Sequence, residues 1–217
     1  MKKIAVILSG SGVYDGTEIQ EAVLTLLAID QCGASYRCFA PNINQHHVIN
    51  HLTGAVSDNE TRNVLVESAR IARGDVEDIS EFYIDEWDAL IVPGGFGAAK
   101  NLSDFALKGS NCQVNEQVLT MCQAFAQANK PAGYMCIASA MLPLIYPEGI
   151  KGTIGNDAAT AASIVDMGME HVAVDVKGVI IDKDNQVVST PAYMLATSIS
   201  EAATGITRLV KTVIAMS

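Results

Sequence analysis

Cys136 stands in a sequence context that is typical of a reactive thiol. An apolar run from Ala132 stops at this cysteine, and the small residues Ala138, Ser139 and Ala140 follow, so the pattern predicts a strand that turns sharply into a helix. Unpaired N–H groups at a helix start favour negative charge and hence the thiolate, the nucleophilic form of cysteine. The alternative is that the side chain is a small buried hydrophobe, as free cysteines usually are.

A proline- and glycine-rich segment, PGGFG, follows the predicted buried strand 88–92 and would lie near Cys136. In doubly wound sheets, ligands bind outside the carboxyl ends of the strands, which is where both segments are predicted to lie. The N–H groups of Gly94 and Gly95 could approach a ligand closely and form an oxyanion hole. The alternative is a tight turn that needs positive φ.

Glu18 opens the helix that follows a third segment of this kind, SGSGVYDGTE. If its side chain faces Cys136, it could transfer protons or hold the thiolate by a hydrogen bond. A solvent-exposed partner of the helix dipole is the alternative. The spacing of Gly10, Gly12 and Gly16 also invites a dinucleotide site, but the next strand ends in FAPN without the acidic residue that would hold the ribose, which disfavours NAD.

The histidines give no metal site. His46, His47 and His51 lie in an irregular stretch without a Cys, Asp or Glu within one turn of them, so we interpret them as loop residues. His171 opens a late strand, where the histidine of a catalytic triad could come from, or it has a structural role.

Composition limits the class of protein. The chain has 217 residues, 49% of them hydrophobic, and a formal net charge of −10, which disfavours binding to nucleic acid or anionic membrane surfaces. No apolar stretch approaches the roughly 18 residues of a membrane span. Five cysteines without a CxxC pair predict free thiols in a reducing compartment, which we expect to be the cytoplasm.

The hydrophobic periodicity predicts one α/β domain over residues 1–217, doubly wound around a mostly parallel sheet. The expected strands are 4–8, 35–39, 88–92, 132–136, 171–174, 179–181 and 186–190. The expected helices are 18–33, 60–72, 113–128, 158–167 and 194–214, together with a helix after Cys136.

Long strings of the sequence resemble the ElbB family, within the PfpI-type, class I glutamine amidotransferase-like superfamily. They are VILSGSGVYDGTEIQEAV, VINHLTG, ETRNVLVESARIARG, IVPGGFGAAKNLSDFA, TIGND and TPAYMLA. The resemblance implies a flavodoxin-like, three-layer α/β/α fold, a homodimer, a link to isoprenoid biosynthesis, and a glyoxalase that needs no metal or organic cofactor and converts glyoxal to glycolate. It places the nucleophile at Cys136, the conserved acid at Glu18, and the oxyanion donors at Gly94, Gly95 and Ile137.

The sequence departs from the superfamily pattern at the catalytic histidine. Ile137 follows Cys136, and STPAYM has no histidine where amidotransferases carry one, which argues against glutamine hydrolysis and peptidase activity. We therefore expect a hemithioacetal at Cys136, with Glu18 as the proton shuttle and a small aldehyde as the substrate. A non-catalytic regulator or cysteine redox sensor is the alternative, because an accessible low-pKa cysteine is also readily oxidised.

Overall fold

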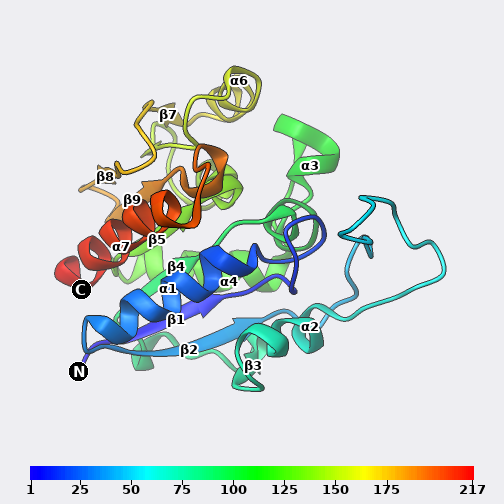
Figure 1. Cartoon of the computed structure of the whole chain (residues 1–217). Helices are drawn as coiled ribbons and strands as arrows, with labels where there is room; N and C mark the ends of the chain where they lie inside the picture. Colours follow the sequence, from blue (N-terminus) through cyan, green and yellow to red (C-terminus); the bar gives the residue numbers. More distant parts are fainter.

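The computed structural model describes all residues from Met1 to Ser217, and a seven-stranded sheet forms its centre (Figure 1). The strand order is β3-β2-β1-β4-β5-β9-β8, and every neighbouring pair is parallel except β8 with β9. The strands are β1 (Lys3–Ile7), β2 (Ser35–Ala40), β3 (Val76–Asp78), β4 (Ala89–Val92), β5 (Ala132–Met135), β8 (Ile180–Asp182) and β9 (Val187–Thr190). This arrangement confirms the predicted mostly parallel sheet.

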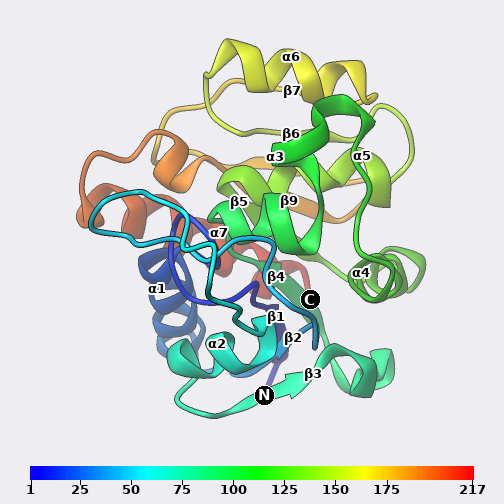
Figure 2. The same cartoon turned by 90° about the vertical axis from the view of Figure 1, so that its right-hand side faces the viewer.

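Helices cover both faces of the sheet and produce the predicted three layers. One face packs against α1 (Ile19–Gln31), α2 (Val64–Ile71) and α7 (Ile199–Met216), and the other against α4 (Glu116–Gln127) and α5 (Leu142–Ile145). Figure 2 shows α1 and α4 on opposite sides of the strands. No helix combines the length and apolar character needed to cross a bilayer.

The unbroken apolar run of β1 follows from burial on both faces. Ile4 and Val6 belong to the core beneath α1 and α7, whereas Ala5 and Ile7 belong to the core beneath α4. Successive strand residues point to opposite faces, so a strand covered on both sides needs apolar residues at every position.

Several predicted boundaries were wrong. Helices α2 and α7 begin four and five residues later than predicted, because the side chains of Asn63 and Ser198 cap them by accepting hydrogen bonds from the N–H groups of Val66 and Glu201. Residues 171–174 do not form a strand of the main sheet. Instead, β7 (Glu170–His171) pairs with β6 (Lys151–Gly152) in a separate two-stranded sheet.

Two excursions extend the molecule beyond the carboxyl ends of the strands. The first follows β4 and contains a π-helical turn, Ala98–Leu102, and the short α3 (Phe105–Lys108). The second contains β6, α6 (Ala158–Asp166) and β7. Figure 2 shows α3 and α6 close together above the sheet, where they stand over the ends of β4 and β5.

Candidate active site

Cys136 follows β5 directly and begins a 3₁₀ turn, Cys136–Met141, that leads into α5. Its φ of +55° lies in the left-handed region, which L residues with a side chain rarely adopt. Such local strain is common at functional sites because the surrounding structure must hold it in place. The predicted sharp turn is therefore present, although a 3₁₀ turn replaces the first part of the predicted helix.

Glu21, which the sequence analysis did not single out, is the carboxyl group beside Cys136. Its side chain is fully buried in α1 and hydrogen-bonds the cysteine thiol. Oε2 accepts a hydrogen bond from the N–H of Gly94 at 2.8 Å, and Oε1 accepts one from the N–H of Tyr193 at 3.1 Å. Backbone groups of two separate segments, one after β4 and one after β9, therefore hold this carboxyl group against the sulfur.

Glu18 lies one helical turn before Glu21 and has a different environment. It is the N-cap of α1, where its Oε2 accepts a hydrogen bond from the N–H of Glu21 at 2.6 Å. The side chain is half-buried on the wall of a cavity that contains Cys136, and burial raises its pKa. The structure thus brings Glu18 to the cavity but places Glu21, not Glu18, against the thiol.

The glycines of the PGG segment allow this close packing. A Cβ at Gly94 would lie 2.6 Å from Cys136 Cβ and 2.8 Å from Glu21 Oε2, so no larger residue fits there. Gly95 has a φ of +92°, and a Cβ on it would lie 2.3 Å from the nitrogen of Glu18. Both glycines are therefore required where the PGG segment packs between α1 and the cysteine.

Two of the three predicted oxyanion donors face the sulfur. The N–H groups of Gly95 and Ile137 hydrogen-bond Cys136. The N–H of Gly94 donates to Glu21 instead, so it is not free to bind a substrate oxygen. Gly94 holds the carboxyl group in place, and the donors that remain near the nucleophile are those of Gly95 and Ile137.

The protonation state of Cys136 differs from the prediction. Burial, together with the nearby Glu21 carboxylate, raises the pKa of Cys136 well above its usual range, although the N–H groups of Ile137 and Gly95 oppose this shift. Burial also raises the pKa of Glu21, to about 7. The expectation of a resting thiolate was wrong, because desolvation and a buried carboxyl group outweigh the N–H groups of a short turn.

The cavity above Cys136 has a volume of about 350 Å³ and is mostly apolar. Its polar side chains other than the cysteine are those of Glu18, Thr160 and Tyr193. The apolar part consists of Val13, Phe96, Ala99, Phe105, Ala106, Ile137 and Met194. This volume lies within the range of about 300–1,000 Å³ that is usual for small-molecule sites.

The histidines lie outside this cavity. His171 is in β7, where its Nε2 accepts a hydrogen bond from the N–H of Ile154 at 3.4 Å. The Nε2 of His51 accepts one from the N–H of Tyr14 at 3.2 Å, which helps to hold the first glycine-rich loop. Nowhere do three His, Cys, Asp or Glu side chains gather as a metal ion would require.

Buried polar residues also hold the first glycine-rich loop, SGSGVYDGTE, in place. Asp15 is 1% exposed, and its Oδ2 accepts a hydrogen bond from the N–H of Ile49 at 2.6 Å. The Nδ2 of Asn101 donates to the carbonyl oxygens of Ser9 and Asp15, at 3.0 and 2.9 Å. The irregular segment around residues 42–58 therefore supports the loop that leads to Glu18 and Glu21.

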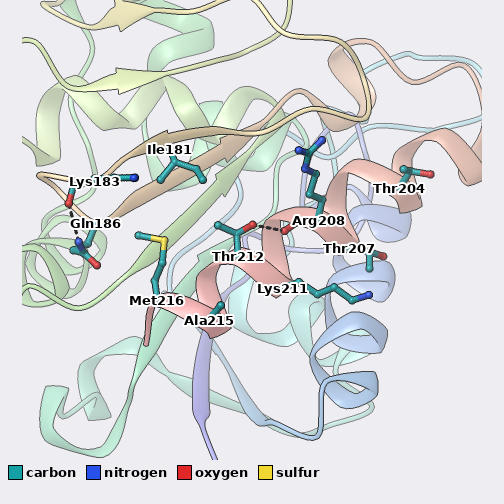
Figure 3. Close-up of a pocket in the computed structure, with 10 residues that line it drawn as sticks. All are labelled: Ile181, Lys183, Gln186, Thr204, Thr207, Arg208, Lys211, Thr212, Ala215 and Met216. Atoms are coloured by element: carbon teal, nitrogen blue, oxygen red, sulfur yellow. Dashed lines mark hydrogen bonds between the residues drawn. The ribbon is translucent and has the colours of Figure 1, made fainter.

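A larger groove lies elsewhere, between α7 and the edge strand β8 (Figure 3). Its volume is about 750 Å³, and its rim includes the cations Lys183, Arg208 and Lys211. It holds no cysteine, histidine or carboxylate, and its lining includes the apolar side chains of Ile181 from β8 and of Ala215 and Met216 from α7. Of these two cavities, only the one above Cys136 is lined by both a cysteine and a carboxyl group.

No protein-family model matches the sequence. The human glutamine amidotransferase-like class 1 domain-containing protein 3, mitochondrial, is 42% identical over 224 residues, which cover 99% of this chain and 83% of the human protein. The mitochondrial ES1 protein homolog of Rattus norvegicus is 41% identical and covers 99% of this chain and 84% of its own length. A crystal structure of an isoprenoid biosynthesis protein with an amidotransferase-like domain from Ehrlichia chaffeensis matches with a TM-score of 0.91 and 37% identity, covering 100% of this chain and 99% of the other.

The comparisons also correct the predicted location. The human and rat relatives are both named as mitochondrial proteins, and this finding contradicts the predicted cytoplasmic location. All five cysteines are free, and free thiols indicate a reducing compartment without specifying which one.

Proposed function

Because the chain belongs to the family of glutamine amidotransferase-like class 1 domain (ES1) proteins, we propose that it is a cofactor-independent glyoxalase with Cys136 as its nucleophile. In the simplest case it converts glyoxal to glycolate. The observation that carries the proposal is the contact between the thiol of Cys136, which lines the cavity, and the buried carboxyl group of Glu21. A nucleophile in contact with a base is the arrangement that covalent catalysis requires.

Glu21 activates the nucleophile in the first step. Its carboxylate accepts the thiol proton while the sulfur attacks the aldehyde carbon, which gives a hemithioacetal. A base works best when its pKa lies near the operating pH, and the pKa of Glu21 is about 7. The N–H groups of Gly95 and Ile137, which face the sulfur, stabilise the oxyanion that forms.

Glu18 moves the proton between the two substrate carbons in the second step. It removes the proton from the carbon bound to sulfur and returns it to the neighbouring carbonyl carbon through an enediol. Its place on the cavity wall and its raised pKa suit both halves of this transfer. The product is a thioester, from which water releases glycolate. One carbon is oxidised and the other is reduced, so no external oxidant is needed.

The lining of the cavity gives little support to glutamine hydrolysis. Glutamine carries an α-carboxylate, which calls for a cation, and the cavity offers the carboxyl group of Glu18 and no Lys or Arg. His171, the candidate for a triad histidine, hydrogen-bonds Ile154 away from the cysteine. The redox-sensor alternative is also weaker, because sensor cysteines are exposed and have a low pKa, whereas Cys136 is 7% exposed and has a raised pKa.

The decisive experiment measures glycolate formation from glyoxal by the purified protein without added metal. We expect Cys136→Ala to abolish turnover and Glu21→Gln to reduce kcat by about 10²–10⁴-fold, the usual contribution of a general base. Cys32→Ala is the matched control, since this cysteine is free but caps the far end of α1. Full activity in Cys136→Ala would reject the proposal.

A further inference from the structure

We infer that the groove between α7 and β8 is a second binding site, whose ligand is a small phosphorylated amphiphile: a phosphate or diphosphate head group on an apolar chain. The groove shares no residue with the cavity above Cys136, so this inference is independent of the proposed glyoxalase. Its volume of about 750 Å³ lies within the range of about 300–1,000 Å³ that is usual for small-molecule sites.

The positive charge of the groove is the first argument. Lys183, Arg208 and Lys211 line it, and no Asp or Glu does. None of these three cations forms an ion pair, although the chain carries 24 acidic residues against 14 Lys and Arg. Three cations without acidic partners create a local positive field in a chain whose net charge is −10, and this field attracts an anion.

The dipole of α7 does not account for these cations. Cations stabilise the C-terminal end of a helix, but the effect falls off within the last turn, and the last turn of α7 contains no basic residue. Arg208 and Lys211 are three residues apart and therefore neighbours on one face of the helix, where their like charges repel each other. An anion bound between them would replace this repulsion with attraction.

The donors of the three cations favour a phosphate over a carboxylate head group. The Nη1 of Arg208 makes one long hydrogen bond, 3.5 Å to the carbonyl oxygen of Lys177, and the ammonium groups of Lys183 and Lys211 make none within the protein. A guanidinium fork matches the oxygens of a phosphate. A phosphate monoester carries about −1.5 to −2 charges and three acceptor oxygens at pH 7, so it can bind several cations at once.

Apolar side chains beside the cations favour an aliphatic chain on the ligand. Ile181 is 39% exposed, and Ala215 and Met216 line the groove with it. Figure 3 shows the side chains of Arg208 and Met216 extending from α7 toward the β8–β9 hairpin, which carries Ile181 and Lys183. No aromatic residue lines the groove, so a nucleobase would lack a stacking partner, whereas an aliphatic chain is stabilised by burial.

The shape of the groove fits an elongated ligand. The face of α7 that lines it runs from Thr204 to Met216, a length of roughly 18 Å at 1.5 Å per residue. The opposite face of α7 packs in the core through Ala202, Ile206 and Leu209, which holds the lining face in place. A compact anion such as inorganic phosphate would occupy only a part of this length.

The test measures binding to the full chain by isothermal titration calorimetry, with methyl, hexyl and decyl phosphate and with decanol, each below its micellar concentration. Each buried methylene strengthens binding roughly fourfold, so we expect decyl phosphate to bind at least about tenfold more tightly than hexyl phosphate, and methyl phosphate to bind most weakly. Decanol, which lacks the charge, should bind at least about tenfold more weakly than decyl phosphate. The affinity for decyl phosphate should fall as the salt concentration rises.

Variants then assign the binding to this groove. We expect Arg208→Gln and Lys211→Gln each to weaken the binding of decyl phosphate by about tenfold or more, through loss of a charge-assisted contact. Arg73→Gln is the matched control, since Arg73 is also exposed and free of ion pairs but follows α2. Ile181→Thr, which keeps a β-branched residue in β8, should weaken decyl phosphate but not methyl phosphate. Turnover of glyoxal should be unchanged in all four variants.

Four results would overturn the inference. Equal affinity for decanol and decyl phosphate would remove the head group, and unchanged affinity in both charge variants would place the binding elsewhere. Tighter binding of a hexaglutamate peptide than of decyl phosphate would assign the groove to an acidic segment of a partner protein. Binding to phosphatidylglycerol vesicles without binding to soluble decyl phosphate would assign it to a membrane surface. None of these results bears on the glyoxalase, which the activity of Cys136→Ala tests separately.

Discussion

The carboxyl group of Glu21 hydrogen-bonds the thiol of Cys136, although the two residues lie on different elements and far apart in the sequence. The N–H of Gly94 donates to the same carboxyl group at 2.8 Å, and a side chain at Gly94 would displace both partners. In the proposed glyoxalase reaction, this carboxyl group serves as the base for the nucleophile, because no histidine lines the cavity above Cys136.

Activity should depend on the ionisation of Glu21. The carboxylate is the form that accepts the thiol proton, and its pKa is about 7. We therefore expect kcat/KM to rise about tenfold per pH unit below this value and to level off above it. Steady-state rates from acidic to mildly alkaline pH check this, with Glu21→Gln as the comparison. The same rise in Glu21→Gln would show that another group titrates.

The raised pKa of Glu21 should also make the stability of the folded protein depend on pH. The ordinary pKa of a glutamate is 4.5, which applies to the unfolded chain, whereas the pKa of Glu21 in the folded protein is about 7. The folded state therefore binds this proton more tightly than the unfolded state does. The contribution of Glu21 to stability is complete below pH 4.5 and is lost as the pH rises through 7, by on the order of 3 kcal/mol. Urea unfolding at several pH values measures this loss.

The Glu21→Gln variant is also the control for the stability measurement. Glutamine does not titrate, so the fall in the free energy of unfolding between pH 4.5 and 7 should be smaller in the variant by this amount. The comparison uses the slope of the free energy of unfolding against pH rather than its absolute value. The absolute stability of the variant will differ in any case, because the glutamine amide cannot accept both backbone hydrogen bonds. Parallel slopes in the two proteins would contradict the assignment.

Gly94→Ala should abolish most of the activity while it destabilises the fold only moderately. The new Cβ would lie 2.6 Å from Cys136 Cβ and 2.8 Å from Glu21 Oε2, so the thiol and the carboxyl group must separate. We expect a loss of about 1–3 kcal/mol in stability, the usual cost of overpacking, and a loss of most glyoxalase activity. Gly54→Ala is the control, since its φ of +75° strains the backbone but it has open space around it. Equal activity in both variants would contradict the packing argument.

Much of the site follows from local sequence patterns. The run 132–136 followed by small residues predicts the turn at Cys136, and the apolar run 88–92 followed by PGG predicts a loop at the same edge of the sheet. Both features depend on residues that are neighbours in the chain, so periodicity and glycine placement were sufficient. The carboxyl ends of parallel strands then bring the two loops together.

The role of Glu21 could not be read in the same way. Glu18 and Glu21 are separated by one turn of α1, and their side chains differ in environment because of the direction in which the helix leaves its N-cap. That direction depends on the loop held by Asp15, Ile49 and Asn101, which are distant in sequence. The spacing of the two residues indicated only that both could lie near the same end of the helix. The cavity walls from α3 and α6 were missed for the same reason, since they depend on tertiary contacts.

Glu18→Gln should separate formation of the hemithioacetal from the proton transfer that follows. Glutamine can still cap α1 through its carbonyl oxygen, so the helix start should survive, but it cannot move a proton. We expect kcat to fall by about 10²-fold or more, whereas the thiol still adds to the aldehyde. Mass spectrometry of the variant with excess glyoxal should then detect the adduct at Cys136. Normal turnover would assign the second proton transfer to Glu21 as well.

His171→Ala should leave catalysis intact, despite the position of this histidine in the late part of the chain where a triad residue was considered. Its Nε2 accepts a hydrogen bond from the N–H of Ile154, and its side chain does not line the cavity. We expect kcat/KM to change by less than a factor of about two, and stability to fall by about 1 kcal/mol through the lost hydrogen bond. Parallel glyoxalase assays and urea titrations measure the two effects. A loss of activity as large as that in Glu21→Gln would show that His171 acts in the reaction and that the base assigned to Glu21 is incomplete.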